Sequence, residues 1–217
     1  MQNFSIIYFS TKGLKVIGII DYNMGNLASV YNACHLIDAK ATIVKDPNDL
    51  KNFNRVILPG VGAYKDAMEH LIQTGMREAV YEYAKSGKPM IGICLGMQLL
   101  FESSEEFGYT KGLGLIEGKV VKFDKSKMCS DLKIPHMGWN KTINKDNPLF
   151  KNLQNPYLYF VHSYHVITDD KYTIATTNYG YDFVSAVNKD NIFGFQPHPE
   201  KSHNNGLKIL ENFINLQ

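Results

Sequence analysis

The sequence has 217 residues, of which 44% are hydrophobic and 20% charged, and 23 Lys and Arg against 21 Asp and Glu give a net charge of +2. This is the composition of an ordinary globular protein, and the near-zero charge argues against nucleic-acid binding, which needs an excess of Lys and Arg. Three cysteines without CxxC spacing argue against a disulfide framework or a thiolate zinc site, and they fit a reducing, cytoplasmic location.

The start of the chain predicts an extension ahead of a single domain. Residues 1–14 contain an apolar run too short for a signal-peptide core, and no segment of the chain approaches the roughly 18 apolar residues that span a membrane. We therefore expect an N-terminal extension over 1–14, one domain over 15–217 and no membrane association.

The first half of the chain alternates strand-like and helix-like segments. We expect strands at 16–22, 41–44, 55–58 and 90–93, and helices at 27–37, 63–71, 76–84 and 95–101. Strands that alternate with helices favour parallel pairing with right-handed crossovers, so helices would cover both faces of the sheet.

The second half changes to strands that follow one another without helices. We expect strands at 120–123, 157–161, 172–177, 184–188 and 192–195, a hairpin turn at 188–191 and a closing helix at 207–213. The predicted fold class is α/β, with a mixed, mostly parallel central sheet flanked by helices and with antiparallel strands in the C-terminal half.

A cysteine stands at a predicted corner between strand and helix, in Gly92-Ile93-Cys94-Leu95-Gly96. This is the nucleophile-elbow pattern with Cys in place of Ser, in which the flanking glycines remove side chains that would clash. The helix that begins at Leu95 would direct its N–H groups at the sulfur and favour the thiolate. The alternative is a buried structural cysteine.

A histidine and a carboxylate follow the last predicted strand, in Pro197-His198-Pro199-Glu200. Pro199 biases His198 toward extended backbone, so His198 and Glu200 would project to the same side. The carboxylate then orients the imidazole and leaves its other nitrogen for the thiol, which is the logic of a catalytic triad. The alternative is an exposed polar turn.

A glycine-rich turn, Pro59-Gly60-Val61-Gly62, follows another strand. Parallel sheets place their sites at the carboxyl edge of the strands, where such a turn can direct backbone N–H groups at an oxyanion. Phosphate binding by this turn is the alternative, and it is weakly supported because Lys65 stands where the last glycine of a GxGxxG pattern would be.

Together, GICLGMQ, PGVGAY and HPEKS resemble the motifs of the class I, triad-type glutamine amidotransferases. DYNMGN near the start, PHMGWN at 135–140 and FVHSYH at 160–165 resemble more narrowly the glutaminase subunits of imidazole glycerol phosphate synthase. The resemblance runs from about Val16 to the C-terminus and implies the class I amidotransferase fold.

The resemblance implies a role for each matched residue. Cys94 would attack the glutamine side-chain amide, His198 would protonate the departing ammonia and then activate water, and Glu200 would orient His198. The oxyanion hole would be formed by the backbone of Leu95 with Val61 or Gly62.

The resemblance also implies the binding residues and the partner. Gln98, Ser163 and Tyr164 would hold glutamine. The surface that faces a cyclase partner would include Asn23, Met137, Trp139, Tyr164 and Lys201. In this heterodimer, glutamine-derived ammonia passes to the cyclase, which makes imidazole glycerol phosphate and aminoimidazole carboxamide ribotide in histidine biosynthesis. No cofactor or metal is implied, and no His, Cys or Asp group has the spacing of metal ligands.

One departure from the family pattern is Pro197, which stands where the family usually has phenylalanine and removes a backbone donor beside the triad. A sister glutaminase subunit that supplies ammonia for surface-sugar amination is therefore the alternative function. A non-catalytic regulator and a stand-alone γ-glutamyl hydrolase are further alternatives. Retention of Cys94, His198 and Glu200 counts against the first, and the PHMGWN surface counts against the second.

Three isolated residues receive plainer interpretations. His136 and His162 are expected to be structural residues with satisfied ring nitrogens. Trp139, the only tryptophan, belongs either to the core or to a contact surface, where Trp and Met are favoured.

Overall fold

The computed structural model describes residues 16–128 and 132–216. The expected extension over 1–14 and Cys129 lie outside the described residues. The strands are β1 (Val16–Ile20), β2 (Lys40–Val44), β3 (Arg55–Leu58), β4 (Met90–Ile93), β5 (Phe101–Ser104), β6 (Thr110–Lys111), β7 (Ile116–Lys122), β8 (His136–Asn144), β9 (Tyr157–His162), β10 (Tyr164–Ile167), β11 (Thr173–Asn178), β12 (Asp182–Lys189) and β13 (Ile192–Phe195). The helices are α1 (Leu27–Leu36), α2 (Tyr64–Gln73), α3 (Met76–Lys85), α4 (Leu95–Leu99) and α5 (His203–Ile214).

Short 3-10 turns complete the described elements. They are η1 (Pro47–Asn52), η2 (Lys125–Lys127), η3 (Pro148–Phe150), η4 (Asp170–Tyr172) and η5 (Pro199–Lys201). Only η5 contributes to the site described below.

The parallel part of the sheet has the order β2-β1-β3-β4-β13. Helix α1 connects β1 to β2, and α2 and α3 connect β3 to β4, as the alternating sequence pattern predicts. β13 joins the edge of β4 only after the second half of the chain. The sheet continues through β12, β10, β7, β5 and β6, and within this part only the β5–β7 pair is parallel. The predicted α/β class with a mixed sheet is confirmed.

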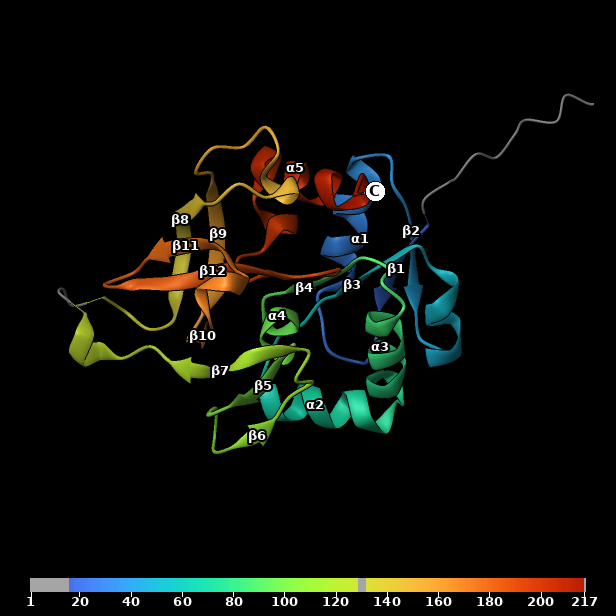
Figure 1. The fold of residues 1–217 in the computed structure, drawn as a ribbon, viewed down its shortest axis with the longest axis horizontal. Coiled ribbons are helices and arrows are strands. Elements are labelled where there is room, and N and C mark those ends of the chain that lie inside the picture. Colours follow the sequence, from blue (N-terminus) through green and yellow to red (C-terminus); the bar gives the residue numbers. More distant parts are fainter. Residues whose placement is uncertain (1–15, 129–131, 217) are drawn as a thin grey trace, which may run out of the picture.

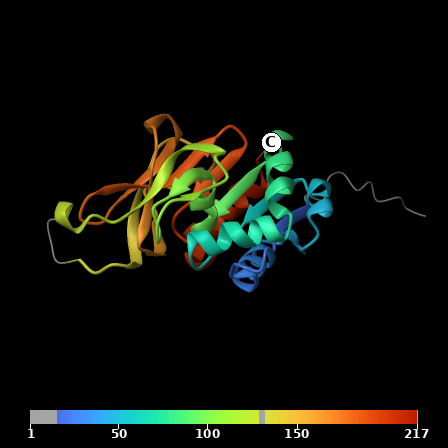
Figure 2. The same ribbon diagram turned by 90° about the horizontal axis from the view of Figure 1, so that it is seen from below.

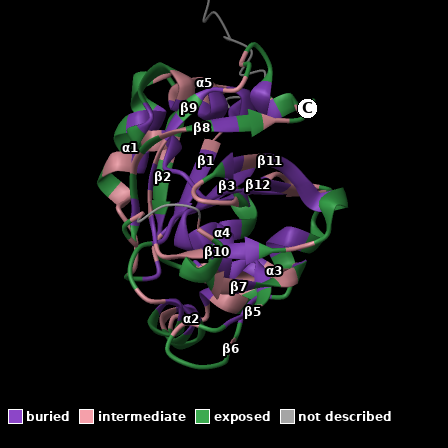
Figure 3. Cartoon of the chain, turned by 90° about the vertical axis from the view of Figure 1, so that its left-hand side faces the viewer, coloured by how far each residue is buried: buried purple, intermediate pink, exposed green. Residues whose placement is uncertain are grey.

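Helices α2, α3 and α4 lie on one side of the parallel strands, and α1 and α5 lie on the other (Figure 1). A hydrophobic core lies between the strands and the helices on each side. Successive side chains of a strand alternate between the faces, so Val56 and Leu58 pack in the core under α2, α3 and α4, whereas Ile57 packs in the core under α1 and α5. Figure 3 shows these central strands coloured as buried, with exposed residues on the outer helices and loops. Burial on both faces explains why these strands are continuous apolar runs.

Three strands of the second half, β8, β9 and β11, lie off the main strand order of the sheet, at one end of the molecule (Figure 2). β11 pairs with β12 and with β8, and β8 pairs with β9, all antiparallel. The predicted hairpin is present, since Lys189 of β12 pairs with Ile192 of β13.

The sequence prediction was wrong at two places in the first half. The helix expected over 95–101 ends at Leu99, and Phe101 begins β5, where it pairs with Ile116 of β7. This pairing is distant in the sequence and overrides the local helical spacing. The strand expected over 16–22 ends at Ile20. No helix in the described part of the chain has both the length and the apolar character needed to cross a membrane.

Candidate active site

The predicted sharp turn lies between β4 and α4. Cys94 has φ 54° and ψ −112°, a strained conformation for a residue with a side chain. A Cβ on Gly92 would lie 2.6 Å from the carbonyl oxygen of Gly96, and one on Gly96 would lie 1.9 Å from that of Leu58. Both flanking positions therefore require glycine, and the sulfur is held at the carboxyl edge of the sheet.

His198 and Glu200 meet beside this turn. The Nδ1 of His198 lies 2.7 Å from the Oε1 of Glu200, and both side chains are buried. The sequence correctly predicted this contact but gave the wrong backbone for it, because Glu200 lies in η5 and not in an extended segment. The turn brings the carboxylate back under the ring.

The surroundings of His198 favour its protonated form. Burial lowers its pKa, but the interactions with Cys94 and Glu200 outweigh burial and raise the pKa to about 10. An imidazolium beside the sulfur is the arrangement in which a thiolate is stabilised.

The backbone around His198 is fixed by strand β9 and by Ser202. The N–H of His198 donates to the carbonyl oxygen of Tyr159 at 2.8 Å. The hydroxyl of Ser202 donates to the carbonyl oxygen of His198 at 2.6 Å and accepts from the N–H of Tyr159 at 2.9 Å. Pro197 lies beyond the end of β13, between the hydrogen-bonded residues Gln196 and His198, so its missing donor removes no bond from the sheet.

The glycine-rich turn after β3 lies directly against the elbow. A Cβ on Gly60 would lie 2.7 Å from the backbone nitrogen of Gly96, so glycine permits this close approach. The positive φ of the turn, 95°, falls on Gly62 and not on Val61. Tyr22, which is fully buried, donates from its hydroxyl to the carbonyl oxygen of Pro59 at 2.9 Å and so supports the turn from beneath.

A pocket of about 280 Å3 opens over Cys94 and brings together most of the predicted site. Its lining includes the triad cysteine and histidine with the predicted oxyanion and glutamine-binding residues, namely Val61, Gly62, Cys94, Leu95, Gln98, Ser163, Tyr164 and His198. Lys201, predicted to face a partner, also lines it. The roles of these residues stay predictions.

The pocket also contains three residues that sequence reasoning did not assign to it: Glu106, Val161 and His162. The Oε2 of Glu106 accepts from the backbone N–H of Tyr64 at 2.7 Å and so caps α2, whose N-cap residue, Ala63, offers no side-chain acceptor. Burial raises the pKa of Glu106, and its hydrogen bond with Tyr64 opposes this. Glu106 lies between β5 and β6, neither of which was predicted, so no local signal identified it.

The remaining predicted partner residues, Asn23, Met137 and Trp139, do not line this pocket and are exposed. Met137 is 62% exposed and Trp139 45% exposed, on the outward face of β8. The Trp139 ring stacks on His203 with ring centroids 4.9 Å apart, so Trp139 belongs to the surface rather than to the core. Asn23 is exposed in the loop after β1. In the same loop Met24 packs near Gly62 of the glycine-rich turn.

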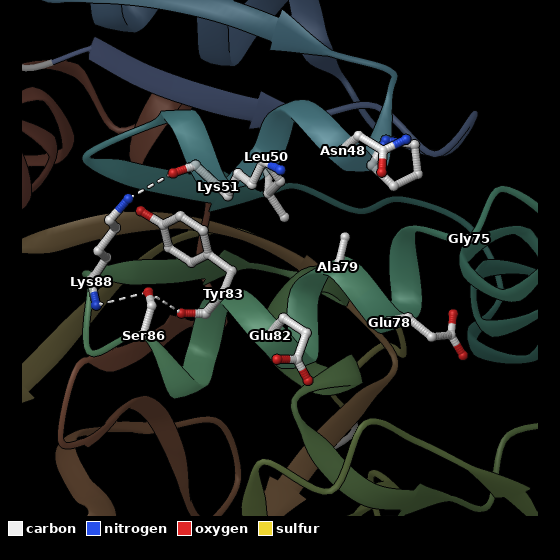
Figure 4. Close-up of a pocket in the computed structure, with 11 residues that line it drawn as sticks. Asn48, Leu50, Lys51, Gly75, Glu78, Ala79, Glu82, Tyr83, Ser86 and Lys88 are labelled. Atoms are coloured by element: carbon white, nitrogen blue, oxygen red, sulfur yellow. Dashed lines mark hydrogen bonds between the residues drawn. The ribbon is translucent and has the colours of Figure 1, made fainter.

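A separate pocket of about 330 Å3 lies between η1 and α3, away from the triad (Figure 4). Several of its polar groups are already engaged by the backbone: Lys88 donates to the carbonyl oxygens of Lys51 and Phe53, and Ser86 donates to that of Tyr83. Glu78 and Glu82 pair with Arg77 and Lys85. None of the predicted site residues lines this pocket.

Comparison with known families and proteins agrees with this geometry. The family described as "Glutamine amidotransferase class-I" matches residues 18–216. A Sulfurimonas denitrificans protein named imidazole glycerol phosphate synthase subunit HisH is 63% identical over 200 residues, which cover 91% of this chain and 97% of that protein. The protein of the same name from Wolinella succinogenes is 56% identical over 204 residues, covering 93% of this chain and 100% of that one.

Solved structures share the fold at low sequence identity. The Thermotoga maritima PurLQS structure matches with a TM-score of 0.71 and 19% identity, over 92% of this chain and 97% of that one. A structure titled as a glutamine amidotransferase matches with a TM-score of 0.71 and 16% identity, over 91% and 98%. The chain therefore belongs to the class I glutamine amidotransferases and, within them, to the family of imidazole glycerol phosphate synthase subunit HisH.

Proposed function

We propose that this chain hydrolyses glutamine to glutamate and ammonia with the triad Cys94, His198 and Glu200, and delivers the ammonia to the cyclase subunit of imidazole glycerol phosphate synthase. The observation that carries the proposal is the convergence at one pocket of a cysteine in a strained elbow and a buried His198–Glu200 pair 2.7 Å apart. Nucleophile, base and orienting group are thereby all supplied.

In the first half-reaction the Cys94 sulfur attacks the side-chain amide carbon of glutamine. The carbonyl oxygen becomes an oxyanion, which the backbone N–H of Leu95 and that of Val61 or Gly62 stabilise. The intermediate then expels ammonia, and the proton that the departing nitrogen needs comes from His198. A γ-glutamyl thioester remains on Cys94.

In the second half-reaction water attacks the thioester. His198 now accepts a proton from the water, the thioester C–S bond breaks, and glutamate leaves with its new carboxylate. Glu200 stabilises the imidazolium whenever it forms, because its Oε1 faces Nδ1. The ammonia must pass directly to the partner, since in neutral water it becomes non-nucleophilic ammonium.

The pocket offers groups of the right kind for the amino-acid end of glutamine. Glu106 is an anion on the wall and suits the α-ammonium group. Gln98 uses both N–H bonds of its amide within the protein, on the carbonyl oxygen of Tyr164 and on Oε1 of Gln196, so its own Oε1 is the atom left for the substrate. Ser163 and Tyr164 also line the pocket, and we propose that they help to bind glutamine.

The partner surface is proposed to comprise Asn23, Met137, Trp139, Tyr164 and Lys201. Exposed Met and Trp side chains on β8 are typical of an interface core, and Lys201 is exposed and lines the pocket. A heterodimer with the cyclase, working in the cytoplasm, is the assembly that this surface suits. The sister subunit for sugar amination is not favoured, because relatives up to 63% identical over nearly the whole chain carry the HisH name.

The function is tested by comparing synthesis that uses glutamine as the nitrogen source with synthesis that uses added ammonia. The chain is combined with the cyclase subunit from the same organism, and synthesis of imidazole glycerol phosphate is measured with glutamine and, separately, with ammonium salts at high pH. We expect Cys94→Ala to abolish glutamine-dependent synthesis and to leave ammonia-dependent synthesis intact. Loss of both with the complex still formed, or loss of neither, would overturn the proposal.

A further inference from the structure

A chain of side-chain amides lies beneath the nucleophile and is not part of the triad. Gln196 is fully buried, and its Nε2 lies 3.8 Å from the Cys94 sulfur. The Oε1 of Gln196 accepts from the Nε2 of Gln98 at 2.9 Å. The same Nε2 of Gln98 donates to the backbone carbonyl oxygen of Tyr164 at 3.0 Å.

The donor and the acceptor of each hydrogen bond in this series of side-chain amides follow from the position of the Tyr164 carbonyl oxygen. A backbone carbonyl oxygen only accepts, so the amide group of Gln98 must present its nitrogen there. That nitrogen has two hydrogens, and the second one faces Gln196, which must therefore present its oxygen to Gln98. The amide nitrogen of Gln196 is then left facing the sulfur, and the opposite orientation would place two donors against each other.

The orientation of the Tyr164 carbonyl is itself secured by a second donor. His162, which lines the same pocket, donates from Nδ1 to this oxygen at 2.8 Å. Its Nε2 lies 3.1 Å from Nδ1 of His136, so both nitrogens of His162 are engaged. The acceptor at the start of the amide chain is thus held from two sides.

We propose that Gln196 is a positioning residue for the nucleophile, whose amide N–H, directed by Gln98 and the Tyr164 carbonyl, holds the Cys94 sulfur as a thiolate aimed into the pocket. This deepens the proposed function, since it rests on Cys94 as the nucleophile. A donor at the sulfur stabilises the anion and not the thiol. The carbonyl oxygen of Val161 also lies 3.9 Å from the sulfur, and it can accept a hydrogen bond only from the thiol form of Cys94. Val161 therefore stabilises the thiol, whereas the Gln196 N–H stabilises the thiolate.

The test measures the pH dependence of Cys94 alkylation by iodoacetamide, which is small and does not need the glutamine-binding groups. The full-length chain is treated between pH 5 and pH 10, and modification of the Cys94 peptide is followed by mass spectrometry. Gln196→Met and Gln196→Leu each replace the amide with an uncharged side chain that has no N–H. Asn212→Leu is the matched control, because it removes a buried amide that bonds to the carbonyl oxygens of Leu149 and Lys151 in another part of the molecule.

We expect both Gln196 variants to be alkylated at Cys94 about 5- to 10-fold more slowly than the parent at pH 7, and at a rate that approaches that of the parent as the pH rises toward 10. Asn212→Leu should follow the parent profile. If Gln196→Met does not fold, the profile of Gln196→Leu is compared with that of the parent instead. Gln196 profiles that superimpose on the parent would overturn the inference. The proposed function is judged separately, by glutamine hydrolysis of the parent complex, so the two failures are distinguishable.

Discussion

The backbone N–H of His198 donates to the carbonyl oxygen of Tyr159 at 2.8 Å, which ties the catalytic base to strand β9. Tyr159 pairs with Trp139 of β8 in the register of the two strands, and their rings meet edge to face with centroids 6.0 Å apart. Trp139, on the strand proposed to face the partner, is therefore connected to His198 through a single residue, Tyr159. A shift of β8 and β9 when the partner docks would change the position of His198.

The hydroxyl of Ser202 bonds to the backbone of both His198 and Tyr159, so we first consider its removal. Ser202→Ala loses the bonds to both His198 and Tyr159, so the base is less well placed while the pocket is unchanged. We expect kcat for glutamine hydrolysis by the complex to fall about 10-fold with little change in KM. Ser202→Thr keeps the hydroxyl and should retain most of the activity. An equal loss in both variants would show that the hydroxyl is not responsible.

The two buried members of the triad should differ in importance. His198→Ala removes the group that carries the proton, and we expect at least about a 10³-fold loss of kcat. Glu200→Gln retains an oxygen that accepts from Nδ1, so we expect a clearly smaller loss, about 10- to 100-fold. Steady-state hydrolysis by the two variant complexes measures both values. Small and equal effects would mean that His198 is not the base.

Three buried histidines should make the fold sensitive to acid. Burial lowers the pKa of His136 to about 4 and that of His162 to about 3, and it also lowers the pKa of His165. Below pH 6.5 the unfolded chain binds protons that the folded chain does not, so this stability is complete above pH 6.5 and is lost as the pH falls toward 4. Each histidine contributes a slope of up to about 1.4 kcal/mol per pH unit.

Urea unfolding at several pH values between 7.5 and 4.5 measures this slope. His136→Phe should make it less steep by about one third, since one of the three histidines no longer titrates. Phe fits between the rings of Phe160 and Tyr179, which stack on His136. The pKa of His198 is raised instead, so its contribution is complete below pH 6.5 and is lost only toward pH 10. An unchanged slope in His136→Phe would contradict the assignment.

Arg55 should be a large contributor to stability with no part in catalysis. It is buried on β3, and its guanidinium donates to the carbonyl oxygens of Phe213, Ile214 and Leu216 at the end of α5. Arg55→Met leaves these carbonyls without their charged donor, and we expect a loss of about 2–4 kcal/mol in the free energy of unfolding. Arg55→Lys should recover part of it. A kcat that falls in the fully folded variant would argue against a purely structural role.

Hydrolysis should depend on the partner. Val61, which avoids positive φ, stands between two glycines, so the peptide planes of the turn can rotate and present either a carbonyl or an N–H to the oxyanion. Loss of one oxyanion donor typically costs about 10²- to 10³-fold in rate. We expect slow hydrolysis by the isolated chain, faster hydrolysis with the cyclase, and the fastest with the cyclase and its acceptor substrate. Full activity of the isolated chain would show that the partner does not control the orientation of this turn.

The parts of the site that follow from local chemistry could be predicted from the sequence. Gly92 and Gly96 identify the elbow because no other residue fits there, and strand–helix alternation identifies the parallel sheet. The short α4 could not be predicted, because Phe101 leaves the helical pattern to pair with β7. Glu106 and the chain from Tyr164 through Gln98 to Gln196 depend on contacts between distant segments, for which the sequence has no periodic signal.

Selective labelling of Cys94 tests the central claim most directly. The complex is treated with a glutamine-like electrophile, with and without excess glutamine, and the modified cysteine is identified by mass spectrometry. We predict that Cys94 is labelled in preference to Cys34 and Cys129, that glutamine protects it, and that the extent of labelling equals the loss of hydrolysis. Labelling of another cysteine that abolishes activity, or loss of activity with Cys94 unmodified, would contradict the account.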